Sequence, residues 1–369
     1  MRVRSAALAL VVALPACGAF TAVGIGSDDP DVPEGATPVV GDGGVPEGGG
    51  GDGGGSSLDS GAPDGSGACA LGTPDHCGVC GHSCNGTKCV GNQCEAERVT
   101  SSGAVTNLSV RGGTLAWVEG ASAGWRCNTA SCVPTSMPYG AIDRLVLLGP
   151  SRAVLSQATQ NLVTAVDWSA ASNQSIAAAG GAAAFAVEGA TVFYAEKNAP
   201  NVYRGAPGIG AVLVARNEAV RGLATQNATL YVAFAGTGGL GRFDPPLGGS
   251  PVPVELPSIP RVDTGAIAAV VTAGNRPCWL KGTTLRCDPG GALVDVVPTG
   301  VTAIASDGPF VYYASNGKLS RIRPDGKGGL DLVKLGASVV VDALAPGDDG
   351  WLYFAVTDGP KLEIRRVAK

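Results

Sequence analysis

The stretch AIASDGPFVYYASNGKLSRIRPDG, residues 303–326, contains the pattern that decides the fold of this chain. A short apolar run ends at a turn with Asp307 and Gly308, and an aromatic-rich run follows it. A second turn, at Asn316 and Gly317, leads into a run that contains arginine. Short runs separated by Gly, Asn and Asp turns are typical of consecutive β-strands. The stretch therefore predicts three strands in succession.

The same pattern recurs from residue 103 to the C-terminus. Its first apolar runs are anchored at Leu108, Leu145, Phe185, Leu223, Ile267, Ile304 and Leu344. Successive anchors are 37, 40, 38, 44, 37 and 40 residues apart, and only the second copy, around Leu145, is weak. A period near forty made of short strands is typical of a β-propeller, in which each repeat forms one four-stranded blade.

This period predicts an all-β fold with a seven-bladed β-propeller over residues 95–369, or a six-bladed one if the weak copy is not a blade. Each blade buries its faces only against its neighbours, so the copies have to close a ring. The last copy ends at Lys369, just after its third strand. We expect residues 97–100, which belong to no other blade, to supply the missing strand and leave no open sheet edge.

Aromatic residues gather on the second predicted strand of the copies. They are Trp117, Phe193, Tyr194, Tyr231, Trp279, Tyr312, Tyr313, Tyr353 and Phe354. Large rings at a repeated position supply the apolar area that packing between blades requires. We interpret them as core residues, and the alternative is a face on which a ligand stacks.

The N-terminus, residues 1–16, has the pattern of a signal peptide. Arg2 and Arg4 precede an apolar run of about ten residues, which is too short to span a bilayer as a helix. The segment ends in Leu-Pro-Ala-Cys, residues 14–17, which resembles the lipobox of bacterial lipoproteins. The resemblance implies that Cys17 is lipidated and becomes the first residue of the mature chain. Because Pro15 is unusual in its position, ordinary cleavage near Ala16 or Ala19 is the alternative.

Residues 17–68 are rich in Gly, Pro, Asp and Ser, and include the run GDGGVPEGGGGDGGGSS. Such a segment cannot bury enough apolar area to fold, so we expect a disordered, acidic tether that acts as a spacer. From Glu95 onward, 23 Lys and Arg residues stand against 21 Asp and Glu residues. A nearly neutral body without a basic stripe gives no electrostatic support to nucleic-acid binding.

Ten cysteines follow Cys17, an even number that fits pairing in an exported protein. We expect all of them in disulfides: Cys69, Cys77, Cys80, Cys84, Cys89, Cys94, Cys127, Cys132, Cys278 and Cys287. The first six form a cysteine-rich module over residues 69–94 whose connectivity the sequence leaves open. The alternative there is a zinc site that uses His82, because Cys77, Cys80 and Cys84 have metal-like spacing. The glycines between these cysteines suit the turns of a disulfide-linked loop, so we expect no metal and no cofactor.

Two resemblances concern these segments. The pattern HCGxCGxxCxGxxCxGxxC, residues 76–94, resembles a module of predicted surface lipoproteins from soil bacteria. The blade pattern VYY followed by LSRIRPDG, within 311–326, is similar to the YWTD and NHL types of propeller repeat. The first resemblance implies no known activity. The second implies a propeller that binds proteins or other ligands, although some related propellers are hydrolases or lyases.

A hairpin with cysteines at both ends, CWLKGTTLRC, occupies residues 278–287. If Gly282 and Thr283 form a type II′ turn, Cys278 faces Cys287 in a non-hydrogen-bonded pair, about 4.5 Å apart at Cα. That distance suits a disulfide. Cys127 and Cys132 enclose four residues, and we expect them to pair in the same way. The alternative for either pair is a redox-active site, although neither has CxxC spacing.

Arginine recurs at one strand position in six of the seven copies: Arg126, Arg204, Arg242, Arg286, Arg321 and Arg365. These residues are candidates for binding an anion or an acidic sugar if they line a channel. The structural interpretation is that their stems pack between blades and their charged ends pair with carboxylates or carbonyls.

Both histidines, His76 and His82, lie in the cysteine-rich module. The propeller therefore contains no Ser-His-Asp site and no histidine-ligated metal. We expect a lipid-anchored, monomeric, non-catalytic protein of the bacterial cell envelope, at the outer membrane or the cell surface. We expect it to bind an envelope or extracellular protein or a glycan, and to contact the membrane through its lipid alone. The alternatives are a polysaccharide lyase or hydrolase with carboxylate, tyrosine or arginine chemistry, and a purely structural spacer.

Overall fold

The computed structural model describes most of the chain from residue 71 to residue 369. Within that range it leaves out residues 80, 121, 158, 179, 198, 209, 236–237 and 246–252. The predicted signal peptide and tether, and with them Cys17, Cys69 and Cys80, lie outside the described residues.

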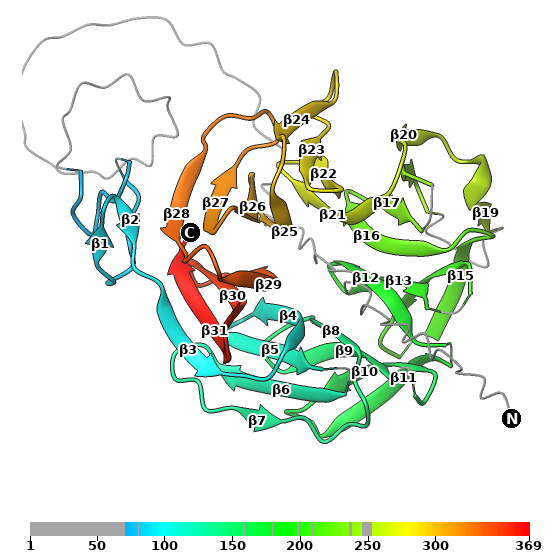
Figure 1. The fold of residues 1–369 in the computed structure, drawn as a ribbon. Helices are drawn as coiled ribbons and strands as arrows, with labels where there is room; N and C mark the ends of the chain where they lie inside the picture. The colour runs from blue at the N-terminus through cyan, green and yellow to red at the C-terminus, as the bar shows by residue number, and fades with distance from the viewer. Residues whose placement is uncertain are drawn as a thin grey trace, which may run out of the picture.

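Seven antiparallel sheets stand around a ring (Figure 1). In each sheet the strands follow one another outward, and the first strands of neighbouring blades contact each other around the whole circle. The expected seven-bladed β-propeller is confirmed, and the seven anchor residues all lie in first strands.

The first four blades use the following strands. Blade one has β4 (Val105–Arg111), β5 (Thr114–Glu119), β6 (Ala123–Asn128) and β7 (Thr135–Ser136). Blade two has β8 (Arg144–Leu147), β9 (Arg152–Gln157), β10 (Leu162–Asp167) and β11 (Ser172–Ala178). Blade three has β12 (Ala182–Glu188), β13 (Thr191–Glu196), β14 (Asn201–Ala206) and β15 (Gly210–Arg216). Blade four has β16 (Val220–Gln226), β17 (Thr229–Phe234), β18 (Leu240–Phe243) and β20 (Arg261–Asp263).

The other three blades complete the ring. Blade five has β21 (Ile267–Ala273), β22 (Arg276–Lys281), β23 (Thr284–Cys287) and β24 (Val294–Val297). Blade six has β25 (Val301–Asp307), β26 (Phe310–Ser315), β27 (Lys318–Ile322) and β28 (Leu330–Lys334). Blade seven has β29 (Val340–Pro346), β30 (Trp351–Asp358), β31 (Lys361–Ala368) and β3 (Glu97–Ser101).

The ring closes with a strand from the start of the propeller. β3 pairs antiparallel with β31, and Glu97 faces Arg366 in this register. The Nε and Nη2 atoms of Arg366 lie 2.9 and 2.8 Å from Oε2 of Glu97. The prediction that residues 97–100 complete the last blade is therefore confirmed.

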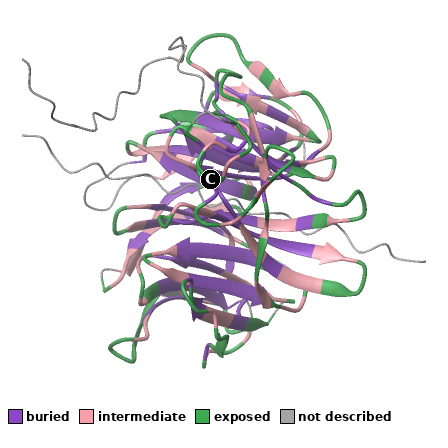
Figure 2. Cartoon of the chain, turned by 90° about the vertical axis from the view of Figure 1, so that its left-hand side faces the viewer, coloured by how far each residue is buried: buried purple, intermediate pink, exposed green. Residues whose placement is uncertain are grey.

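The predicted aromatic positions belong to the core. Eight of the nine rings are buried, and Tyr313 is half-buried. Figure 2 shows the buried residues along the strands and the exposed ones at the loops. The core interpretation of the aromatic residues therefore holds, and those eight buried rings present no open face for a ligand.

The weak second copy is a real blade with a shorter first strand. In the six other blades, a register shift lies near the start of the first strand, where it pairs with the second. β8 has only four residues and pairs with β9 without such a shift. Its apolar run is short for that reason, which explains the faint sequence signal.

The longest repeat step, 44 residues, also has a structural reason. Between β18 and β20 the chain visits blade three, where β19 (Val254–Glu255) pairs parallel with β15. Arg216 Nε donates to Glu255 Oε1 at 2.7 Å beside this extra strand. The one-turn 3-10 helix η1 (Leu256–Ser258) then leads back toward blade four. Within the described part of the chain, no helix has the length and apolar character to cross a membrane.

The blade-five hairpin has the expected register. Cys278 pairs with Cys287 and Trp279 with Arg286, and the two cysteines form a disulfide with Cα atoms 4.1 Å apart. Gly282 has a φ of 61°, as the first position of a type II′ turn requires. Cys127 and Cys132 also form a disulfide, at the end of β6.

Candidate functional site at the seam between module and propeller

The cysteine-rich module is part of the propeller core. Its described residues, 71–79 and 81–94, include the short hairpin of β1 (Cys89–Val90) and β2 (Gln93–Cys94), which lies beside β28 (Figure 1). Three of its cysteines, Cys77, Cys84 and Cys94, are at most 1% exposed and share one apolar cluster with blades six and seven. We call this contact the module seam. The sequence suggested a separate module, whereas the structure fixes it against the two blades.

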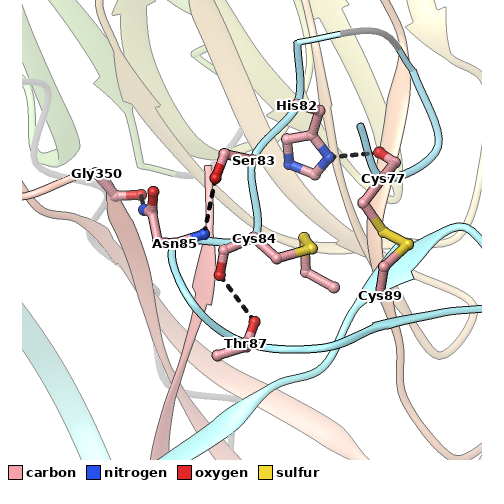
Figure 3. Close-up of a disulfide and its surroundings, with 9 residues drawn as sticks. Cys77, His82, Ser83, Cys84, Asn85, Thr87, Cys89 and Gly350 are labelled. Atoms are coloured by element: carbon pink, nitrogen blue, oxygen red, sulfur yellow. Dashed lines mark hydrogen bonds between the residues drawn. A yellow bond between two sulfur atoms is a disulfide. The ribbon is translucent and has the colours of Figure 1, made fainter. Parts of the chain in front are cut away.

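A hydrogen bond also holds the module in place. Asn85 Nδ2 donates to the carbonyl of Gly350 at 3.1 Å, which ties the module to the turn between β29 and β30 (Figure 3). Within the module, Gly78 has a φ of 78°, and a Cβ there would lie 2.6 Å from the carbonyl oxygen of Asn92. Glycine is therefore required at this position.

The described module cysteines form two disulfides, Cys77–Cys89 and Cys84–Cys94. The pairing supports the disulfide interpretation over the zinc alternative and supplies part of the connectivity that the sequence left open. His82 is not beside the sulfurs as a ligand. Its Nδ1 lies 2.8 Å from the carbonyl oxygen of Cys77 (Figure 3).

His82 is buried in the seam, with 4% of its surface exposed. Burial lowers the pKa of His82, and the nearby charge of Arg321 lowers it further, although hydrogen bonds with the backbone of Cys77 and Ala368 act in the opposite direction. The neutral imidazole is therefore the form that suits the docked module.

This environment predicts a pH dependence of stability. Above the unfolded pKa near 6.5, His82 is neutral in both states. As the pH falls below 6.5, the unfolded chain binds a proton that the folded chain does not. The free energy of unfolding then decreases, by at most about 1.4 kcal/mol per pH unit. Urea unfolding of the wild type and of His82→Gln between pH 8 and 5 measures this effect. We expect the variant to have a flatter profile, and parallel profiles would contradict the assignment.

A groove of about 650 Å³ opens along the module seam. One wall comes from residues 90–96 of the module and its exit, and the other from residues 333–339 of blade six and the turn after it. Asp358 and Arg365 of blade seven lie at its end. Val90, on the rim, is 63% exposed. We call this cavity the seam groove.

The seam groove carries charges of both signs. Arg365 is paired, with Nη2 at 2.8 Å from Glu363 and 3.8 Å from Asp358. Among the described residues, Glu95 and Lys334 have no ion-pair partner, and both are exposed. An unpaired carboxylate and an unpaired ammonium on one rigid groove can each bind a charged or polar group of a partner.

A second hollow, of about 450 Å³, lies between the module and blade six, and its lining includes Gly78, Asn92, Tyr313 and Asp331. Burial raises the pKa of Tyr313. Burial alone would also raise the pKa of Asp331, but hydrogen bonds from Lys318 and Ser320 outweigh it and lower that pKa. Asp331 therefore stays ionised and engaged within blade six.

The six predicted arginines do not line a channel. Each lies on the third strand of its blade, two strands outside the inner ring, so the channel interpretation is wrong. Their surroundings differ from one to the next. Two of them form ion pairs: Arg286 with Asp263 and Asp295, and Arg365 with Glu363. Two others stack on aromatic rings: Arg126 on Trp168, and Arg321 on Phe310. Arg242 is exposed opposite Tyr231, and Arg204 lies opposite Phe193. The structural interpretation fits the paired and stacked members, whereas a ligand-binding role for any of the six stays a prediction.

Sequence reasoning missed the seam groove because its two walls are more than two hundred residues apart in the chain. Neither Glu95 nor Lys334 belongs to a motif. No local signal in the sequence marks this surface.

The fold and the seam define the class: a seven-bladed β-propeller scaffold with a disulfide-linked module packed into its core. No protein-family model matches the chain, and the search of curated proteins also finds no match. Solved structures do resemble it. A chain of the mitotic checkpoint complex is 15% identical, with a TM-score of 0.53 over 74% of this chain and 94% of that one. U3-55K is 8% identical, with a TM-score of 0.56 over 74% and 98%. The computationally designed Ika8 protein is 14% identical, with a TM-score of 0.50 over 73% and 90%. At these identities the likeness shows the fold alone, that of WD40-like propellers.

Proposed function

We propose that this chain is a non-catalytic binding protein, held outside the cytoplasm by a lipid on Cys17, whose seam groove binds an envelope protein or a glycan. The observation that carries the binding role is the seam groove itself. The groove has a volume of about 650 Å³, and two unpaired charged residues, Glu95 and Lys334, line it. Disulfides and core packing hold its walls in place. Because this surface is already ordered, binding a partner does not require the free energy of ordering it.

The lining of the groove supports binding rather than catalysis. Among its described lining residues there is no Ser, Thr, Tyr or His, and its cysteine, Cys94, is in a disulfide. The described lining of the groove therefore offers no hydroxyl or free thiol as a nucleophile. The lyase or hydrolase alternative was based on carboxylate, tyrosine or arginine chemistry in the channel. The six arginines lie on third strands instead, and no observation favours this alternative.

Export and anchoring rest on the sequence pattern of residues 1–17 and on the disulfides of the described chain, which suit an oxidising compartment. The mature chain purified from membranes tests this part of the proposal. We expect its mass to correspond to an N-terminal Cys17 with three acyl chains and to ten oxidised cysteines. A chain that begins elsewhere, or that carries free thiols, would contradict it.

Site-specific photo-crosslinking in intact cells tests the binding role. A photoreactive residue at Val90, on the exposed rim of the groove, should capture one partner. The same residue at Thr159, an exposed position in blade two, should not. Adding Glu95→Lys to the Val90 probe should reduce capture several-fold because it reverses a charge on the groove. Equal capture from both positions, or none from Val90, would overturn the proposal.

A further inference from the structure

A small hollow of about 240 Å³ lies where blade one meets the strand that closes the ring. Its lining includes Trp117, Glu119 and Trp125 of blade one, and residues 101–103 at the end of β3 and just after it. We call it the tryptophan hollow. It shares no lining residue with the seam groove. Because it is smaller than the pocket of a drug-sized ligand, it suits one small chemical group.

The environment of Trp125 differs from that of the other half-buried tryptophans. Three of the five tryptophans of the chain are half-buried, namely Trp125, Trp168 and Trp351. The guanidinium of Arg126 lies over the Trp168 ring, 4.9 Å from its centroid. That of Arg366 lies over the Trp351 ring at 4.4 Å. Among the described residues, no cation lies over Trp125. Because the face of an indole attracts cations, this ring is open to one from outside the chain.

The tryptophan hollow also contains a carboxylate without an ion pair. Glu119 Oε1 accepts from Trp117 Nε1 at 2.9 Å, and this hydrogen bond holds the carboxylate in place. Glu119 Oε2 has no ion-pair partner among the described residues. A Cβ at Gly103 would lie 3.0 Å from Oε2, so the missing side chain of this glycine leaves the oxygen uncovered. A negative charge beside an indole favours a cationic ligand.

The other polar groups of the hollow are engaged or covered. Arg98 Nη2 donates to Ser101 Oγ at 2.6 Å, and Arg98 Nε lies 3.8 Å from Glu363. Ser102 Oγ is covered from solvent. Among the described lining side chains, Glu119 is therefore the acceptor that is both open and unpaired. A primary ammonium has three N–H donors and would leave some of them without an acceptor, at a cost in free energy. A fully methylated ammonium has no N–H.

We propose that the tryptophan hollow binds a quaternary ammonium group of the choline type. The methyl groups pack on the face of Trp125, whose ring attracts the positive charge. The Glu119 carboxylate supplies the opposite charge. Trp117 is a positioning residue, since it is fully buried and acts by holding Glu119. This site is a second one, and its existence does not depend on the seam groove.

Titration of the whole ¹⁵N-labelled chain with choline tests the proposal. Each of the five indole N–H groups gives one signal in a ¹H–¹⁵N spectrum, and substitution of each tryptophan assigns the signals. We expect choline to shift the signals of Trp117 and Trp125. The other three signals should stay in place, and they belong to Trp168, Trp279 and Trp351. The neutral isostere, in which a carbon replaces the nitrogen, should bind about tenfold more weakly because it lacks the charge.

Phosphocholine is the second probe, because the same ammonium group occurs free and on phosphate headgroups. Shifts of the Trp117 and Trp125 signals with both compounds identify a headgroup site. Shifts with choline alone identify a site for the free cation, from which Glu119 repels the phosphate. Either result supports an ammonium site in the tryptophan hollow.

Four variants locate the site. Glu119→Gln keeps an acceptor for the Trp117 indole but loses the charge, and it should weaken choline binding about tenfold. Trp125→Leu should weaken it to a similar degree. Glu255→Gln removes a partly exposed carboxylate of blade three, and Trp168→Leu removes a half-buried ring of blade two. These two controls should bind choline like the wild type, and circular dichroism checks that all four keep the fold.

Three results would overturn the proposal. The first is that choline and phosphocholine leave the Trp117 and Trp125 signals in place. The second is that the neutral isostere binds as tightly as choline. The third is that folded Glu119→Gln and Trp125→Leu bind choline like the wild type.

Discussion

Replacing Asp263 by alanine should lower the free energy of unfolding by roughly 3–5 kcal/mol. The Asp263 side chain is 6% exposed and accepts from Trp279 Nε1 at 2.9 Å, from Lys281 Nζ at 2.8 Å and from Arg286 Nη1 at 3.1 Å. Burial alone would raise the pKa of Asp263, but the hydrogen bonds from Lys281, Trp279 and the backbone of Thr264 outweigh burial and lower it. In Asp263→Ala, two cations and the N–H of a fully buried indole lose their shared acceptor. Breaking a buried ion pair in this way costs far more than removing an exposed one.

Asp295→Ala is the matched control. Asp295 also pairs with Arg286, with Nε 2.5 Å from Oδ1, but 46% of its side chain is exposed. Because solvent screens this pair, we expect a loss of about 0–1 kcal/mol. Urea unfolding, followed by tryptophan fluorescence, measures both variants. Equal losses in the two would show that burial does not set the strength of the Asp263 network.

The ring could be predicted from the sequence because every blade repeats the same local pattern. Leu108, Phe185 and Ile304 each start an apolar run buried on both faces, and such runs are visible at any point of the chain. The prediction that residues 97–100 close the ring followed from counting strands, because the last copy had three strands instead of four. The register of Cys278 and Cys287 followed from the turn at Gly282, since a two-residue turn fixes the pairing of a hairpin.

The seam groove could not be predicted because it has no local pattern. Val90 and Lys334 meet only after the ring has closed and brought the first part of the propeller beside the last. The prediction that the arginines line a channel was wrong for a related reason. Their repetition showed that they share a strand position, but Arg286 and Arg365 lie on third strands, and the sequence did not show how far from the ring axis that strand lies.

Locking the ring closed should stabilise the chain strongly. Ser101 on β3 faces Glu363 on β31. In the double variant Ser101→Cys with Glu363→Cys, we expect dissolved oxygen to oxidise the two thiols to a disulfide, without any other oxidant. The new bond closes a loop of more than 250 residues and raises the free energy of unfolding by about 2–4 kcal/mol, since it restricts the unfolded chain. The gain appears as a higher urea midpoint than that of the single variant Glu363→Cys, which has already lost the ion pair between Glu363 and Arg365.

An out-of-register pair is the control. Glu97 faces Arg366, so Lys361 lies five residues further along β31, about 17 Å away. Cysteines at Glu97 and Lys361 are too far apart to bond in the folded chain. They should stay reduced and give no gain in stability.

The state of the two introduced thiols in the native Ser101→Cys/Glu363→Cys chain tests ring closure most directly. The account predicts that both resist alkylation and that the intact mass is 2 Da below that of the dithiol. Two alkylated thiols in this variant, or a disulfide that forms equally well between positions 97 and 361, would contradict a propeller closed by β3.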